Sequence, residues 1–167
     1  MDADQKKKLL RMVPYGLYLM GVRRAKVANV ASDINAFIAS WVTQTSFDPP
    51  MLVACVKRDG HSIEMLRESK VFTLNILKSD QKELATTFFK TLDVTETTMS
   101  GVAYERGSKT GCPTFPELAG HVECEVKHIY EGDNDHAVVV AEIVDAIQRD
   151  TEAKAMTHAD TGWHYAG

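Results

Sequence analysis

Hydrogen-bonding side chains are concentrated in the stretch that leads to Asp48-Pro49-Pro50. Within seven residues, the sequence supplies three hydroxyl groups and one amide group, from Ser40, Thr43, Gln44 and Ser46. The two prolines stiffen the turn that follows, because each fixes its own φ and keeps the preceding residue out of helix. A strand of this kind can hold rigid hydrogen-bonding groups against the edge of a bound ligand. The alternative for the same residues is a set of hydroxyls scattered along an exposed strand.

A second polar cluster, Lys57-Arg58-Asp59-Gly60-His61-Ser62, lies where an apolar stretch ends and a helical pattern begins. The first N–H groups of a helix lack intrahelical partners, so together with two cations and a hydroxyl they can bind a phosphate. Lys90, which follows Phe88 and Phe89, can add another cation. The alternatives are a solvated turn with ordinary surface charges for the cluster and core packing for the two phenylalanines.

Several common catalytic motifs are absent from the sequence. No G-x-G-x-x-G pattern follows an expected strand, which argues against a Rossmann dinucleotide site. Gly107-Ser108-Lys109-Thr110 differs from a phosphate-binding loop, because Ser108 stands where the glycine before the lysine is required. No G-x-S-x-G nucleophile elbow is present, so a hydrolase of that class is not supported.

The histidines and cysteines do not indicate a metal site. The six histidines form no H-E-x-x-H motif and no close pair. The three cysteines, Cys55, Cys112 and Cys124, are odd in number and lack metal-type spacing. We therefore expect reduced cysteines that pack as small hydrophobic side chains.

The composition is that of a globular protein of about one domain. The chain has 167 residues, of which 44% are hydrophobic and 25% charged, and this is enough apolar material for one core. The formal net charge of −4 argues against a dedicated nucleic-acid or anionic-membrane binder. No apolar run approaches the roughly 20 residues of a membrane-spanning helix, and no signal-peptide core follows the charged start Met1–Lys8. We expect a single domain over 1–167, located in the cytoplasm.

The elements that must position these residues are mostly strands. Hydrophobic patterning and β-favouring residues predict strands at 17–22, 36–45, 51–56, 71–77, 122–127 and 136–147, with a weaker one at 25–31. In the strand at 122–127, alternation predicts that Glu123, Glu125 and Lys127 face solvent.

Helices are expected at 4–12, at 61–69 and after Asp80, where Asp80-x-x-Glu83 resembles a capping box. The glycine- and proline-rich stretch 91–120 is expected to be a functional loop or a dimer element. Strands and helices do not alternate regularly, so we expect an antiparallel barrel or sandwich with helices at its ends.

The segment 35–50, which reads NAFIASWVTQTSFDPP, resembles the signature of the flavin reductase-like, FMN-binding split-barrel family. Similar segments follow in the family's order: MLVACVK at 51–57, His61-Ser62, VFTLNIL at 71–77 and Q-x-x-L-A-x-x-F at 81–88. The second half adds GCP at 111–113, VEC at 122–124, Asp135-His136 and the tail WHYAG at 163–167. The resemblance covers nearly the whole chain. Two departures are Ile38, where related reductases often carry Thr or Ser, and Ala141, where many carry Gly.

The resemblance implies a mainly β protein, an antiparallel six-stranded Greek-key split barrel with a few short helices. It implies an NAD(P)H:flavin oxidoreductase that takes hydride from NADH or NADPH onto FMN, or onto FAD, and passes the electrons on. Members are usually homodimers with FMN at the subunit interface, so 91–120 and 148–167 are expected interface segments. The expected partners are a nicotinamide, a flavin and a monooxygenase or redox protein, with neither nucleic acid nor membrane.

Carried onto this sequence, the resemblance implies a flavin site made of Ser40, Trp41, Thr43, Gln44, Ser46, Cys55, Lys57, Arg58, His61, Ser62, Phe88 and Lys90. His136 is the residue expected nearest the nicotinamide, where an imidazole can hydrogen-bond the amide or complement phosphate charge. A surface histidine that starts a strand is the alternative. Trp163 and Tyr165 are expected to cover a flavin face, to line a dimer seam or to pack as a simple tail.

Two other functions remain open from the sequence. An electron-transfer flavoprotein of the flavoredoxin type would hold FMN firmly and exchange electrons with an iron–sulfur or rubredoxin-type partner, without oxidising nicotinamides itself. A non-catalytic flavin- or haem-binding module on the same barrel is the third, although no axial haem ligand motif is present. The choice between NADH and NADPH also stays open, because no Arg cluster or acidic residue lies in a recognisable ribose-reading context.

Overall fold

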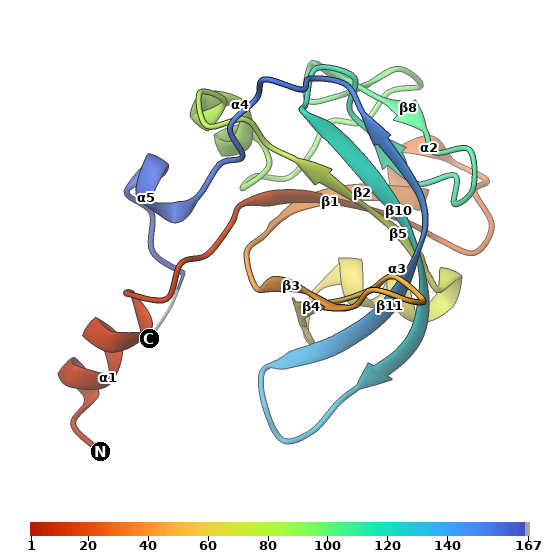
Figure 1. The fold of residues 1–167 in the computed structure, drawn as a ribbon. Coiled ribbons are helices and arrows are strands. Elements are labelled where there is room, and N and C mark those ends of the chain that lie inside the picture. The colour runs from red at the N-terminus through yellow and green to blue at the C-terminus, as the bar shows by residue number, and fades with distance from the viewer. Residues whose placement is uncertain (166–167) are drawn as a thin grey trace.

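Seven strands form one antiparallel sheet in the computed structural model, which describes residues 1–165 (Figure 1). The strands of this sheet are β1 (Tyr18–Arg23), β2 (Ile34–Ala39), β3 (Val42–Ser46), β4 (Met51–Lys57), β5 (Val71–Ile76), β10 (Gly120–Tyr130) and β11 (His136–Gln148). Their order in the sheet is β2-β1-β5-β10-β11-β4-β3, and each neighbouring pair is antiparallel. The expected mainly β, antiparallel fold is confirmed.

The single strand expected at 36–45 is two strands in the structure. β2 ends at Ala39 and β3 begins at Val42, and the two lie on opposite edges of the sheet, beside β1 and β4. Ser40 and Trp41 alone join these edges, so the sheet must curl into a barrel for the chain to connect them. Because residues that favour strands stand on both sides of the break, propensity could not reveal it. The break also gives the sheet seven strands, one more than the resemblance implies.

Two hydrophobic clusters fill and cover the barrel. The interior cluster joins side chains of the strands to the inner face of helix α3 (His61–Ser69), which packs against one end of the barrel through Ile63, Met65 and Leu66. The second cluster lies on the other face of β1 and β2, where Leu19 and Ala36 pack with helix α4 (Lys82–Thr87) and the long loop. Packing on both faces fixes β2 and therefore the position of the break that follows it.

Strand β10 departs from the expected alternation at Glu123. Glu125 and Lys127 are exposed as expected, whereas Glu123 is fully buried. Its carboxylate accepts hydrogen bonds from the hydroxyl and the N–H of Thr110, each at 2.7 Å, and from the N–H of Lys109 at 3.1 Å. The prediction of an exposed Glu123 is wrong because a loop from elsewhere in the chain covers that face of the strand.

The stretch 91–120 supplies this loop. It contains two small hairpins, β6 (Thr98–Met99) with β7 (Val102–Ala103) and β8 (Glu105–Arg106) with β9 (Pro113–Thr114). Between β8 and β9 a side chain at Gly107 would clash with the Glu123 carboxylate, so this close approach needs glycine. Part of the long loop is therefore a structural cover for the outer face of the barrel.

The stretch 25–31, predicted as a weaker strand, is a loop that leads into the short helix α2 (Val30–Asp33). Asp33 is buried, and its carboxylate accepts from the N–H groups of Ala28 and Asn29 and from the hydroxyl of Ser32. These bonds satisfy the backbone of the loop locally, in place of a neighbouring strand.

The capping box expected at Asp80 and Glu83 is also absent. Helix α4 begins at Lys82 with Gln81 as its N-cap residue, and no side chain caps it. The Gln81 side chain instead accepts from the N–H of Lys78, so it stabilises the turn before the helix rather than the helix itself.

The N-terminal end of the described chain lies apart from the sheet, whereas the C-terminal end returns to it at Tyr165. Helix α1 (Ala3–Leu10) stands away from the barrel and buries none of its residues (Figure 1). The last helix, α5 (His158–Thr161), ends at Gly162 in the left-handed conformation and is followed by Trp163–Tyr165. Over residues 1–165, no helix has both the length and the apolar character needed to cross a membrane.

Candidate functional site

The break between β2 and β3 opens a first cavity, of about 130 Å³, beside Ser40 and Trp41. Five parts of the chain line it: the end of β2 with the β2–β3 junction, the end of β4, the start of α3, the start of β11 and the tail at Tyr165. Its polar and aromatic lining residues are Ser40, Trp41, Cys55, Lys57, Ser62, His136 and Tyr165. The fold therefore brings together six of the residues predicted for the site from segments far apart in the sequence.

A second cavity, of about 250 Å³, adjoins the first. The two share Ile38, Ser40 and Tyr165, and the remaining walls of the second are Leu17, Phe89, His158, Trp163 and His164. Aromatic and aliphatic side chains dominate this lining, which suits a planar ring with few polar groups.

His136 is the centre of a hydrogen-bonded chain at the edge of the first cavity. It is buried at the start of β11, with Nδ1 2.9 Å from Oδ1 of Asp135 and Nε2 2.8 Å from Oη of Tyr165. A carboxylate oxygen only accepts, so Nδ1 carries a hydrogen, and in the neutral ring Nε2 accepts from the Tyr165 hydroxyl. The hydrogen bond from His136 also lowers the pKa of Asp135. The sequence left open that His136 is a surface residue at the start of a strand, but its ring is buried.

Trp41 packs against two of these hydrogen-bonded residues, His136 and Tyr165. Its ring centroid lies 4.7 Å from that of His136 and 5.2 Å from that of Tyr165. The indole Nε1 is buried and finds no hydrogen-bond partner within residues 1–165. A buried donor without a partner is unfavourable, so this N–H is suited to an acceptor brought by a ligand.

The N-terminus of α3 borders the first cavity through Gly60 and Ser62. Gly60 is the N-cap residue and has no side chain to occupy the first N–H groups of the helix. Lys57, at the end of β4, adds a positive charge on the same side, although it also lies 3.4 Å from Asp59. Helix N–H groups, a hydroxyl and a cation together suit a phosphate.

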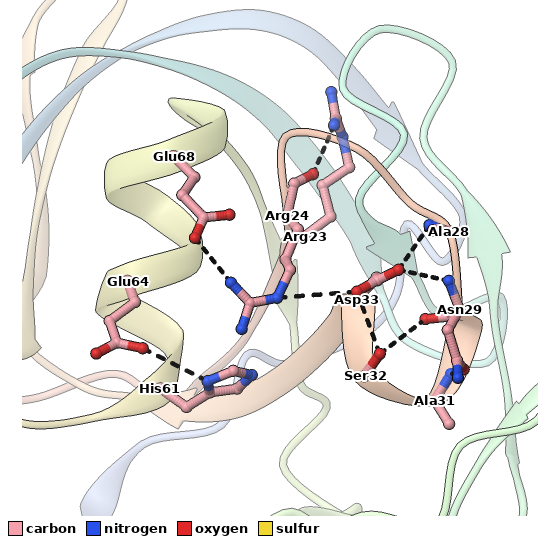
Figure 2. Close-up of polar contacts among 10 residues, drawn as sticks. All are labelled: Arg23, Arg24, Ala28, Asn29, Ala31, Ser32, Asp33, His61, Glu64 and Glu68. Carbon is pink, nitrogen blue, oxygen red and sulfur yellow. Dashed lines mark hydrogen bonds and ion pairs between the residues drawn. The ribbon is translucent and has the colours of Figure 1, made fainter.

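A third cavity, of about 270 Å³, borders the same helix start and is lined by Arg24, Asn35, His61 and Lys90 among others. Figure 2 shows Arg24 reaching both Asp33 and Glu68, at 3.8 and 2.7 Å, and His61 facing Glu64. These carboxylates offset the charge of Arg24. Lys90 makes no ion pair with the part of the chain that the structure describes, so it is the cation here best able to attract an anion.

Five predicted site residues lie outside the three cavities: Thr43, Gln44, Ser46, Arg58 and Phe88. The first three are on β3, an edge strand of the sheet. The guanidinium of Arg58 donates instead to the carbonyl oxygens of Gly132 and Asn134, and so it holds the turn between β10 and β11. Phe88 packs in the second hydrophobic cluster, with its ring 5.4 Å from that of Phe115.

The cavities also contain residues that sequence reasoning did not assign to the site. Asn35, Phe89 and His158 line them, and no motif or spacing connects these three. The Nδ1 atom of His158 lies 2.8 Å from the carbonyl oxygen of Trp163, and this bond fixes the ring beside the second cavity. The last two residues of the predicted tail motif, at 166–167, lie outside the described residues.

The amino-acid sequence is similar to those of known flavin reductases. Residues 10–167 match the family described as "Flavin reductase like domain". A "Probable flavin reductase" from Rhizobium meliloti (strain 1021) is 27% identical over 129 residues, which are 77% of this chain but only 40% of that protein. An "NADH-dependent FAD reductase" from Streptomyces globisporus is 25% identical over 154 residues, 86% of this chain and 78% of that protein.

The fold is also found among solved structures. The crystal structure of BorF, the flavin reductase component of a bacterial two-component tryptophan halogenase, aligns with a TM-score of 0.78 at 23% identity. The alignment covers 96% of this chain and 95% of that chain. The same barrel architecture therefore extends over nearly the full length of both chains.

Proposed function

Because the chain belongs to the flavin reductase-like family, we propose that it is an NAD(P)H:flavin oxidoreductase that reduces FMN and passes the electrons on. One observation carries the proposal: two adjoining cavities meet at Ser40 and Tyr165, beside a helix N-terminus that no side chain caps. Such a site offers room for two planar rings and a place for a phosphate. We also propose that residues 1–167 form a single domain of this family.

The residues around the first cavity fit a flavin. The edge of a flavin ring carries hydrogen-bond acceptors, and the buried Nε1 of Trp41 is a donor without a partner within residues 1–165. Ser40, which is buried and borders both cavities, adds a hydroxyl. For the phosphate we propose the first turn of α3 with Ser62, together with Lys57 and Lys90 from the flanking segments.

The protein's own residues bind and orient the reactants. When bound, the flavin would supply the redox chemistry, because its ring can accept a hydride, which carries the two electrons. His136, held by Asp135, presents its imidazole beside the cavity and is proposed to hydrogen-bond the carboxamide or a phosphate of the nicotinamide nucleotide. The apolar walls of the second cavity limit the access of water to the two rings.

The proposal also specifies which flavin is bound, which nucleotide donates the electrons and which kind of partner receives them. FMN follows from the resemblance of 35–50, and FAD is the alternative that the name of the Streptomyces globisporus relative supports. The same name supports NADH as the donor. The halogenase reductase component supports a partner enzyme that uses reduced flavin. We also propose a homodimer in which 91–120 and 148–165 contribute to the interface.

The test begins with a visible absorption spectrum of the protein after loading with FMN, and in parallel with FAD, followed by removal of excess flavin. NADH and NADPH are then added anaerobically to separate portions. Bleaching of the bound flavin within seconds supports the reductase and identifies the donor. A flavin that is retained but stays oxidised with both donors would instead favour an electron-transfer flavoprotein. Failure to retain or turn over either flavin would refute the proposal.

A further inference from the structure

Tyr165 stands at the boundary between the first and second cavities. Its side chain lines both, its hydroxyl lies 2.8 Å from Nε2 of His136, and its ring centroid lies 5.2 Å from that of Trp41. Tyr165 is 48% exposed in the single chain, so roughly half of its surface is not covered by other residues of the same chain. A side chain held in this way closes the junction of the cavities without being locked into the core.

The segment just before Tyr165 is anchored more firmly. Nζ of Lys82 donates to the carbonyl oxygen of Thr161 at 2.6 Å, and the ring of Trp163 packs edge-to-face on Phe89, with centroids 4.8 Å apart. The ring of His158 bonds the carbonyl of Trp163. The chain is therefore fixed up to Trp163, and Tyr165 can change position without unfolding the segment that carries it.

Two rings that exchange a hydride must come into direct contact, with reacting atoms about 3–3.5 Å apart. If the two cavities take a flavin and a nicotinamide, as in the proposed function on which this inference rests, the side chain at their shared boundary lies in the way. Ile38 and Ser40 also form that boundary, but they belong to the barrel. Tyr165 is the boundary residue that can move.

We propose that Tyr165 is a gate between the two cavities, closed by its hydrogen bond to His136 and displaced when a planar nicotinamide ring enters at their shared boundary. Burial raises the pKa of Tyr165, and the charge of Asp135 acts in the same direction, so the hydroxyl stays protonated and can donate to His136. The closed gate and the nicotinamide compete for the same place.

Competition of this kind multiplies the apparent affinity for the nucleotide by the fraction of molecules whose gate is open, so a mostly closed gate weakens binding. Tyr165→Phe removes the hydrogen bond to His136 but keeps the ring, and Tyr165→Ala removes both. Loss of one hydrogen bond shifts such an equilibrium by about two- to tenfold. We expect Tyr165→Phe to tighten nucleotide binding within this range, and Tyr165→Ala to tighten it at least as much.

The test uses Trp41 as a reporter, since the sequence has only two tryptophans. In a Trp163→Phe background, quenching of Trp41 fluorescence by acrylamide measures access to the cavity without any turnover. The same signal measures the dissociation constants of oxidised nicotinamide mononucleotide and of FMN. Tyr165→Ala is expected to increase acrylamide quenching and to bind the nicotinamide nucleotide more tightly. Tyr130→Ala, at an exposed tyrosine on β10, is the matched control and is expected to change neither quantity.

The outcomes separate the gate from other roles and from the proposed function. Weaker or unchanged nucleotide binding in both Tyr165 variants would overturn the gate and would make Tyr165 a stacking or packing residue. Circular dichroism and the melting temperature check that each variant is folded, and Tyr165→Phe keeps the test decisive if Tyr165→Ala is not. Tighter binding of the mononucleotide by a chain that binds no flavin would support the gate while refuting the proposed function.

Discussion

Nδ2 of Asn35 donates a hydrogen bond to Oγ of Ser62 over 3.0 Å, and this bond ties strand β2 to the first turn of helix α3. Asn35 lines the third cavity and Ser62 the first, so the bond lies where both cavities meet the helix N-terminus. Because Asn35 is the donor, the hydroxyl of Ser62 keeps its own hydrogen for an acceptor. This is the orientation that a phosphate oxygen requires.

Ser62→Ala should weaken FMN binding about tenfold or more and leave riboflavin binding unchanged. A hydrogen bond to a charged group is worth about 1.5–3 kcal/mol, and riboflavin has no phosphate to receive it. Titration of each flavin by fluorescence measures both dissociation constants. Thr45→Ala, on the exposed edge strand β3, is the control. Equal loss of the two ligands would show that Ser62 supports the helix rather than the phosphate.

Lys90→Ala should weaken FMN binding more at low salt than at high salt. Lys90 is exposed, so its attraction to a phosphate acts largely through water and is screened by added ions. Dissociation constants measured at several salt concentrations give the slope for each variant. Lys7→Ala, on the helix α1 that stands away from the barrel, should leave the slope unchanged. A Lys90 variant with the wild-type slope would exclude this cation from the phosphate site.

Glu123→Gln should lower the free energy of unfolding by about 1–3 kcal/mol, the cost of leaving buried polar groups unsatisfied. The Glu123 carboxylate accepts from the N–H groups of Lys109 and Thr110 and from the Thr110 hydroxyl. A glutamine amide would turn one NH₂ group toward these donors. Urea denaturation measures the change, with Glu125→Gln on the exposed face of the same strand as the control. Similar effects at the two positions would contradict the anchoring role of Glu123.

Asp160 should make stability sensitive to acid. The hydroxyl of Thr157, Lys154 and the N–H of Thr157 bond this carboxylate and lower its pKa to about 2. In the unfolded chain the pKa is about 3.9. The stabilising contribution is therefore complete above about pH 4 and is lost as the pH falls through about 2. Asp160→Asn should be less stable than wild type at pH 7.

The difference between the wild type and Asp160→Asn should shrink as the pH falls from about 4 to 2, because protonation removes the same interaction from the wild type. Urea midpoints measured across this range test the prediction. Asp133→Asn, in the exposed turn between β10 and β11, is the matched control. A difference that stays constant with pH would mean that the effect of the substitution does not come from the charge of Asp160.

Cys55 should be the cysteine that iodoacetamide modifies in the folded chain. It is partly exposed and lines the first cavity, whereas Cys112 and Cys124 are buried. Burial raises the pKa of the Cys55 thiol, so modification should be slow at neutral pH and faster as the pH rises. FMN should protect Cys55 if it fills this cavity. Peptide mass spectrometry follows the modification, and a rate that FMN leaves unchanged would place the flavin elsewhere.

Much of the framework follows from local sequence. The helix expected at 61–69 is α3, with the same bounds, and the apolar run at 51–56 is the core of β4. These elements follow from hydrophobic periodicity and from the turn residues that bound it, and both are local properties. The two failures at 25–31 and at Asp80 are also informative. In each, a backbone N–H donates a hydrogen bond to a nearby side chain, and this bond stabilises the turn rather than the expected strand or cap.

The candidate site followed from sequence only in part. Ser40 and Trp41 border the first cavity, whereas Thr43 and Gln44, two and three residues further along, lie on an exposed edge strand. The difference is the break between β2 and β3, at which the chain passes from one edge of the sheet to the other. A run of residues that all favour strands gives no local sign of such a break.

The sequence by itself determined the antiparallel, mainly β framework, the family resemblance and most of the segments that meet at the cavities. Only the tertiary structure decided that Glu123 is buried, that Asn35 donates a hydrogen bond to Ser62 and that Tyr165 bonds His136 at the edge of the first cavity. Periodicity reports which face of a single strand or helix is apolar. Which groups become partners depends on contacts between segments distant in the chain, and those contacts exist only after the barrel has closed.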